Sequence, residues 1–212
     1  MFAEMSRQFL AQIVMTAPLS AKFDEALLFA SNLHRDQIRK GSGVPYVAHL
    51  LSVTAIALEY GADEEEAIAA LLHDAIEDQA NGDAEGLKNR ISEMFGEKVL
   101  VIVEACTDAE LIPKPPWRER KEQYIAHLAE ASPSALLVSA SDKLHNARSI
   151  LRDLRTVGAD VWSRFKGGRD GTLWYYRALV TAFEDQGRSA LTDELNRVVS
   201  EIESLASPSL PN

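Results

Sequence analysis

Residues 63–78 read DEEEAIAALLHDAIED, and this stretch decides the fold. Its apolar residues recur at three- and four-residue spacing, which predicts one helix over the whole stretch. Asp63 is a suitable N-cap, and the three glutamates after it suit the positive end of the helix dipole. Because Ala, Leu and Ile of this helix lie on nearly all of its faces, we expect it to be buried.

The same helical spacing extends along most of the chain. It marks the segments 20–34, 46–60, 86–106, 117–131, 134–154, 170–185 and 189–206. Strand-like alternation is weak, and the one apolar run that could form a strand, ALLVSA (135–140), leads directly into helical sequence. The sequence therefore predicts an all-α helical bundle.

The 212 residues are enough for one domain with a substantial core. We assign residues 20–206 to that domain, 1–19 to an N-terminal extension or helix, and 207–212 to a frayed tail. No glycine- or proline-rich stretch is long enough to mark a second domain. The prediction is a single-domain protein.

Charge and cysteine content narrow the partners and the compartment. The net charge of −10 disfavours DNA and RNA, whose phosphates need a basic face. A small anionic ligand would need several cations gathered in one pocket. No apolar run approaches the roughly 18 residues that span a membrane. The single cysteine, Cys106, excludes an intrachain disulfide and fits a cytoplasmic protein.

One imidazole and three carboxylates lie within six residues of the central apolar helix, in HDAIED (73–78). Buried carboxylates are costly unless they are paired, hydrogen-bonded or bound to a metal. We therefore predict that His73 and Asp74 bind a metal ion. Glu77 and Asp78, one helical turn later, could orient or deprotonate an attacking water. A solvent-facing acidic helix end is the alternative, and an HD dipeptide alone would not exclude it.

Two further residues could complete a metal site. His49 lies on another apolar helix, in VPYVAHLLSV, where a core histidine is the alternative interpretation. Asp142 follows the apolar run LLVSAS. Two imidazoles and two carboxylates suit Mn²⁺, Fe²⁺, Co²⁺ or Zn²⁺ better than Mg²⁺ or Ca²⁺, which prefer oxygen ligands.

Polar residues beside these candidate ligands favour a phosphate-containing substrate. They are Arg39, Lys40, Lys143, Asn146 and Arg148. The first two precede a glycine-rich turn, and the others follow the later aspartate on one helix. Taken singly, each cation could equally be a solvated surface charge. His145 is predicted to support the site rather than to bind the metal.

Four sequence blocks carry a resemblance to a known family. They are HRDQIRKGSGVPYVAHL (34–50), AIAALLHDAIED (67–78), ISEMFGEKVLVIVEACTD (91–108) and LLVSASDKLHNARSIL (136–151). In order and spacing they resemble the HD hydrolase domain of the Rel/Spo stringent-response enzymes, and in particular the stand-alone small alarmone hydrolases. The resemblance covers about residues 20–155 and implies an HD-domain helical bundle.

The resemblance also implies a reaction and roles for individual residues. The metal, usually manganese, would be held by His49, His73, Asp74 and Asp142. Glu77 with Asp78 would act at the attacking water. Arg39 would stack on the base, Lys40 would contact phosphate and Asn146 the sugar. The implied reaction removes the 3′-pyrophosphate of (p)ppGpp and yields GDP or GTP.

Departures from the family pattern keep alternatives open. Leu50 rather than proline follows His49, Lys143 stands where arginine is usual, and the RK turn carries an extra residue. The substrate could therefore be ppApp, NADPH or a nucleoside monophosphate, and a nucleotide-sensing module without turnover is a further alternative. We expect no synthetase activity, and a homo-oligomer stays open. The segment WRERKEQY (117–124) is predicted mainly as helix surface, and Tyr175 and Tyr176 as core.

Overall fold

The computed structural model describes residues 18–80, 82–107 and 115–207. The predicted N-terminal extension and C-terminal tail fall almost wholly outside these ranges, and their structure stays untested. All regular elements within the ranges are helical, and the one β-bridge joins Ile38 to Pro45. The all-α prediction is confirmed.

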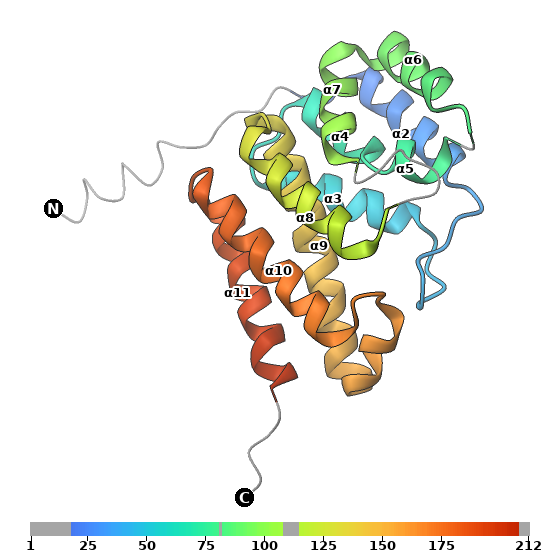
Figure 1. Cartoon of the computed structure of the whole chain (residues 1–212). Coiled ribbons are helices and arrows are strands. Elements are labelled where there is room, and N and C mark those ends of the chain that lie inside the picture. The colour runs from blue at the N-terminus through green and yellow to red at the C-terminus, as the bar shows by residue number, and fades with distance from the viewer. Residues whose placement is uncertain (1–17, 81, 108–114, 208–212) are drawn as a thin grey trace, which may run out of the picture.

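Ten α-helices and two short 3₁₀-helices make up the described fold (Figure 1). The α-helices are α2 (Ala21–Leu33), α3 (Val47–Glu59), α4 (Glu64–Leu72), α5 (Ala75–Gln79), α6 (Ala84–Phe95), α7 (Glu97–Cys106), α8 (Trp117–His127), α9 (Pro133–Val157), α10 (Gly168–Asp185) and α11 (Ala190–Ala206). The 3₁₀-helices are η2 (Leu128–Glu130) and η3 (Gly158–Arg164). None of these helices combines the length and apolar character needed to cross a membrane.

Two of the helices expected from the sequence are each divided in the structure. The helix expected over 63–78 ends at Leu72, and α5 begins at Ala75, with Asp74 at φ −100° and ψ 2° between them. The helix expected over 86–106 is divided at Gly96, whose φ of 97° suits a residue without a side chain. Apolar spacing continues across both breaks, so periodicity alone could not show them.

The N-cap expected at Asp63 is present. Its carboxylate accepts a hydrogen bond from the Glu66 N–H at 2.8 Å, and the Glu66 carboxylate accepts one from the Asp63 N–H at 2.8 Å. Lys98 adds an ion pair to Asp63 at 2.7 Å. This capping box fixes the start of the helix that leads to the HD pair.

We expect Asp63→Ala to lower the free energy of unfolding by about 1 kcal/mol, because the first turn of α4 loses its cap. Asp63→Asn should retain most of the stability, since asparagine caps a helix about as well as aspartate. Chemical denaturation of the two variants measures both values. Equal losses in the two variants would assign the effect to the Lys98 ion pair instead of the cap.

Helix α9 connects the two hydrophobic cores of the domain. One core gathers α2 to α7, and the other gathers α8, α9, η3, α10 and α11. Leu137 of α9 packs against both, and α9 contacts α3, α4 and α7 as well as α11. In Figure 1 the long helices α10 and α11 lie on one side of α9, and α2, α4, α6 and α7 lie on the other. Side chains from both halves therefore meet along α9.

Candidate functional site

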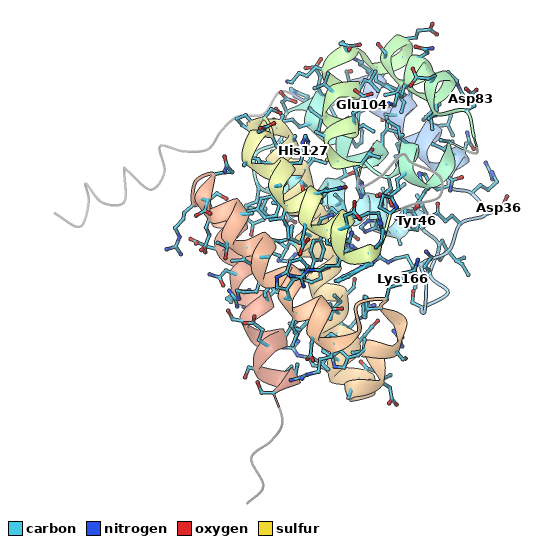
Figure 2. The ribbon with its side chains drawn as sticks, in the orientation of Figure 1. Asp36, Tyr46, Asp83, Glu104, His127 and Lys166 are labelled. Atoms are coloured by element: carbon cyan, nitrogen blue, oxygen red, sulfur yellow. The ribbon has the colours of Figure 1, made fainter. Side chains whose placement is uncertain are left out.

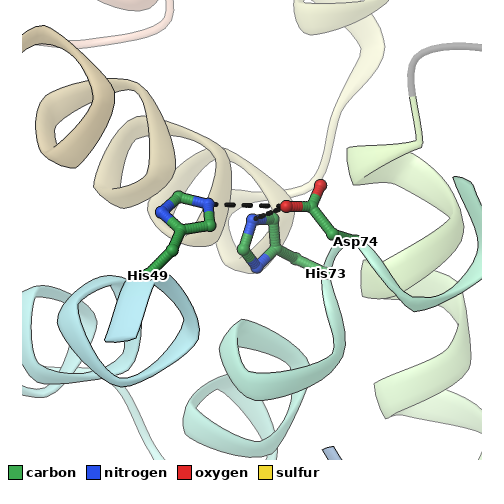
Figure 3. A group of neighbouring side chains, drawn as sticks. All are labelled: His49, His73 and Asp74. Carbon is green, nitrogen blue, oxygen red and sulfur yellow. Dashed lines mark ion pairs between the residues drawn. The ribbon is translucent and has the colours of Figure 1, made fainter. Parts of the chain in front are cut away.

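Four donor side chains from three parts of the fold converge beside α9. His49 comes from α3, His73 and Asp74 come from the junction of α4 and α5, and Asp142 comes from α9. His49 Nε2 lies 3.4 Å from Asp74 Oδ2 and 3.3 Å from Asp142 Oδ1. His73 Nε2 lies 3.0 Å from Asp74 Oδ2 and 3.7 Å from Asp142 Oδ1. The structure thus brings together all four predicted ligands, three of which Figure 3 shows.

The donor atoms of His73 fit a metal ion. Its Nδ1 lies 2.8 Å from the Ala70 carbonyl and donates to it, which leaves Nε2 directed at the carboxylates of the cluster. This Nε2 is buried and makes no hydrogen bond within the described residues. Nε2 can face these carboxylate oxygens only with a proton or a metal ion between them, so this donor set suits a divalent metal that replaces the proton.

His145 sets the orientation of the His49 ring, as the Ala70 carbonyl does for His73. The two Nδ1 atoms lie 2.7 Å apart. Burial, with the neighbouring His49 and Arg39, lowers the pKa of His145 to about 4. His145 is therefore neutral near pH 7 and accepts the Nδ1 proton of His49, whose Nε2 is left free for a metal.

We expect His145→Phe to weaken Mn²⁺ binding by about 10- to 100-fold, because His49 loses the acceptor that sets its tautomer. His145→Asn keeps an acceptor oxygen and should lose less. Isothermal titration with Mn²⁺ gives the affinities. His127→Phe makes the same change at the exposed end of α8, outside the cavity, and serves as the control. Unchanged affinity in His145→Phe would remove its positioning role.

The electrostatics of the cluster keep both carboxylates ionised. Burial alone would raise the pKa of Asp74, but the His73 imidazolium outweighs it and holds that pKa well below its usual range. Burial would likewise raise the pKa of Asp142, but Lys143, whose Nζ lies 2.7 Å from Asp142 Oδ2, holds that pKa well below its usual range. Burial alone would lower the pKa of His73, but the carboxylates of Asp74 and Asp142 outweigh burial and raise it. The cluster therefore attracts positive charge, and a metal ion would compete with that proton.

Tyr46 belongs to the site although sequence reasoning gave it no role. Its hydroxyl donates to Asp74 Oδ2 at 2.5 Å. Burial and the nearby Asp74 raise the pKa of Tyr46, so it keeps the proton that it donates. Figure 2 shows Tyr46 between the helices, whereas Asp36 of the same loop lies at the outer edge. The PY dipeptide before α3 was the only signal for it.

The two predicted acid–base residues face a cavity beside the cluster. Glu77 and Asp78 lie on α5 and line this cavity of about 430 Å³. Asp78 Oδ2 accepts a hydrogen bond from Gln37 Nε2 at 2.7 Å. Gln37 Oε1 in turn lies 2.6 Å from His34 Nδ1 and 2.5 Å from Gln79 Nε2. This network holds Asp78 in place at the cavity wall.

Four of the five predicted substrate contacts line the same cavity. They are Arg39, Lys40, Lys143 and Asn146. Arg39 donates to Asn146 Oδ1 at 2.8 Å, and Asn146 donates to Asp142 Oδ1 at 2.5 Å. A chain of hydrogen bonds thus joins the RK turn to the metal cluster.

The model of the HD domain family matches residues 26–173. The chain belongs to the HD-domain family. It is 36% identical over 152 residues to a Danio rerio protein named guanosine-3′,5′-bis(diphosphate) 3′-pyrophosphohydrolase MESH1, covering 70% of this chain and 78% of that protein. An Aquifex aeolicus guanosine-3′,5′-bis(diphosphate) 3′-pyrophosphohydrolase is 36% identical over 130 residues, which are 61% of this chain and 18% of that longer protein.

The fold agrees with this assignment. A solved structure described as a metazoan ortholog of SpoT that hydrolyses ppGpp superposes with a TM-score of 0.70 at 30% identity, covering 88% of this chain and 97% of that one. The resemblance to the HD domain of the Rel/Spo enzymes and to the stand-alone hydrolases is confirmed.

Arg148 is the one predicted substrate contact that this HD domain does not place at the cavity. Its guanidinium donates to Glu194 Oε1 of α11 at 3.0 Å, and it is absent from the cavity lining. On α9 the residues facing the cavity include Asn146 and Ser149. A position six residues after Asp142 is turned by about 240° around the helix and faces elsewhere. The prediction used closeness in sequence and is corrected.

Several residues that line the cavity were missed or given another role. The missed cations are Arg152 and Arg164, from the end of α9 and from η3. Lys121 of the WRERKEQY segment lines the cavity, although that segment was predicted mainly as surface. Tyr175 and Tyr176 are buried, as expected of core residues, yet they also form part of the cavity wall. Their positions depend on how α8, η3 and α10 pack, which local sequence does not encode.

Proposed function

We propose that this protein hydrolyses the 3′-pyrophosphate of (p)ppGpp, leaving GDP or GTP and releasing pyrophosphate. The observation that carries the proposal is the meeting of His49, His73, Asp74 and Asp142 beside a cavity that carboxylates and cations also line. The names of the MESH1 relatives and of the superposed structure support the same substrate.

The four donors would hold a divalent cation, which we propose is Mn²⁺, with Fe²⁺, Co²⁺ and Zn²⁺ as alternatives. Such a cation supplies Lewis-acid chemistry for hydrolysis at phosphorus. Glu77 accepts the proton of the attacking water, and Asp78, held by Gln37, orients that water. Water adds to the phosphorus attached to O3′, the P–O3′ bond breaks, and O3′ takes up a proton.

The substrate contacts divide among the remaining cavity residues. Arg39, which donates to Asn146, stacks on the base, and Asn146 contacts the sugar; both side chains line the cavity, which supports these roles. Lys40 and Lys143 supply positive charge for phosphate oxygens. The proposed partner is therefore a small nucleotide rather than DNA or RNA.

Product analysis tests this function. The purified protein with Mn²⁺ is incubated with ppGpp, pppGpp, ppApp, NADPH and nucleoside monophosphates, and the products are separated by ion-exchange chromatography. We expect GDP and GTP with pyrophosphate from the two guanosine substrates. If another nucleotide of the panel were cleaved while ppGpp stayed intact, the proposed substrate would be wrong. Binding of ppGpp without any turnover would favour the sensing module.

The location of the protein stays a prediction. The proposal of a cytoplasmic enzyme rests on the single cysteine, Cys106, which is buried. Burial raises the pKa of this thiol to about 12, so it is not poised for redox chemistry. A homo-oligomer likewise stays open.

A further inference from the structure

His34 is a buried histidine for which the reaction described so far has no use. It is the C-cap of α2, is 2% exposed, and is not among the described residues that line the cavity. Its Nε2 atom is buried and makes no hydrogen bond within residues 18–80, 82–107 and 115–207. A buried nitrogen without a partner costs stability, because it has lost its hydrogen bonds to water. Stability alone would favour an apolar residue here, which indicates another role.

The hydrogen bonds around Gln37 fix the tautomer of His34. Gln37 Nε2 donates to the Asp78 carboxylate at 2.7 Å, so Oε1 is the end of the amide that faces His34. His34 Nδ1 lies 2.6 Å from this oxygen and donates to it. Burial lowers the pKa of His34, so the ring is neutral near pH 7 and Nε2 carries no proton. One bond from His34 therefore orients the amide that positions Asp78.

The ring of His34 makes a second, separate contact. It stacks on the ring of Tyr46, with the two centroids 5.3 Å apart and 14° between the ring planes. Tyr46 donates to Asp74 Oδ2 at 2.5 Å, and its ring lies edge-on to His49 with centroids 5.4 Å apart. A flat ring packed on Tyr46 restricts the positions that its hydroxyl can take. Through this one neighbour, His34 acts on two donors of the metal cluster.

We propose that His34 is a positioning residue for both halves of the site: its Nδ1–H holds Asp78 beside the attacking water, and its ring holds Asp74 at the metal. The Asp78 half rests on the proposed function. A side chain that touches both paths keeps the acid and the metal in register, and a misplacement of about 1 Å can cost on the order of 100-fold in rate. Because the two contacts use different parts of one imidazole, a replacement can keep one and remove the other.

His34→Phe removes the Nδ1–H donor and keeps a flat ring against Tyr46. We expect kcat for ppGpp to fall by about fivefold, as for loss of one hydrogen bond, because the Gln37 amide and with it Asp78 become less fixed. The Mn²⁺ affinity of the metal-free protein, measured by isothermal titration, should stay unchanged. The free energy of unfolding should not fall, since the variant also removes the unpartnered Nε2. A residue with a purely structural role would lose stability instead.

His34→Asn makes the opposite change. Its amide can place an N–H near the position of Nδ1, whereas the ring against Tyr46 is lost. We expect Mn²⁺ affinity to fall by about threefold to tenfold, the scale of an aromatic pair. At saturating Mn²⁺, kcat should change less than in His34→Phe. His127→Phe and His127→Asn make the same two changes at the exposed end of α8 and should alter neither value.

Two double variants test whether His34 acts through the neighbours named here. Tyr46→Phe lacks the hydroxyl that reaches Asp74, so adding His34→Asn to it should lower Mn²⁺ affinity little further. Gln37→Leu lacks the amide that reaches Asp78, so adding His34→Phe to it should lower kcat little further.

The outcomes separate this role from the proposed function. Equal effects of His34→Phe and His34→Asn on kcat and on Mn²⁺ affinity would overturn the inference, and so would full additivity in the double variants. A wild-type protein that left every nucleotide of the panel intact would refute the proposed function and, with it, the Asp78 half. The metal half would still be decided, because the Mn²⁺ titration needs no substrate.

Discussion

Replacing Glu77 by Gln and Asp78 by Asn together should lower kcat for ppGpp by about 100- to 10,000-fold, the range expected for loss of general acid–base catalysis. Both replacements keep the shape of the side chain and remove its ability to accept a proton. Asp78 is held at the cavity wall by Gln37, and glutamine can still bond to the asparagine that replaces Asp78. The effect should therefore fall on kcat rather than on folding.

The measurement combines initial rates with metal content. Because neither residue belongs to the donor cluster, the double variant should keep the bound Mn²⁺ of the wild type. Glu201→Gln with Asp193→Asn makes the same two changes on α11, where these carboxylates pair with Arg155 and Arg188. That control should turn over ppGpp at the wild-type rate. An unaltered kcat in the cavity variant would show that the two acids have no role at the attacking water.

The sequence predicted which side chains meet in the cluster because each of them departs from the apolar pattern of its helix. His49, His73 and Asp142 are titratable residues inside apolar helical runs, and all three are buried in the structure. Burial of such groups is costly without partners, so their presence points to a shared purpose. Helical periodicity also placed most helices close to their observed ends.

The parts that could not be predicted depend on tertiary contacts. The break between α4 and α5 turns Asp74 towards the cluster, yet apolar spacing runs through it without interruption. Tyr46 meets Asp74 across the fold, and Arg164 reaches Asp153 from η3. Arg148 shows the opposite error, since closeness in sequence to Asp142 placed on the cavity a residue that faces α11.

The second large effect is expected at Asp142. Its Oδ1 lies within 3.7 Å of the Nε2 atoms of both His49 and His73, and it is the cluster's only donor from α9. Asp142→Asn keeps the volume and removes the charge that a cation needs. We expect Mn²⁺ affinity to fall by more than the 10- to 100-fold typical of residues that only support a ligand. Hydrolysis of ppGpp should fall to the background rate.

Metal content and thermal stability together test this assignment without relying on turnover. In the wild type, Mn²⁺ at about 100 times its Kd should add about 2.7 kcal/mol to the stability of the folded state, and the same addition should hardly stabilise Asp142→Asn. Asp153→Asn makes the same change on the same helix, where the carboxylate pairs with Arg152 and Arg164. This variant should keep both the metal and the stabilisation. The asparagine at 142 leaves Lys143 a polar partner, whereas alanine would leave this largely buried ammonium without one. Retention of a full equivalent of tightly bound Mn²⁺ by Asp142→Asn would show that the metal is held by other groups.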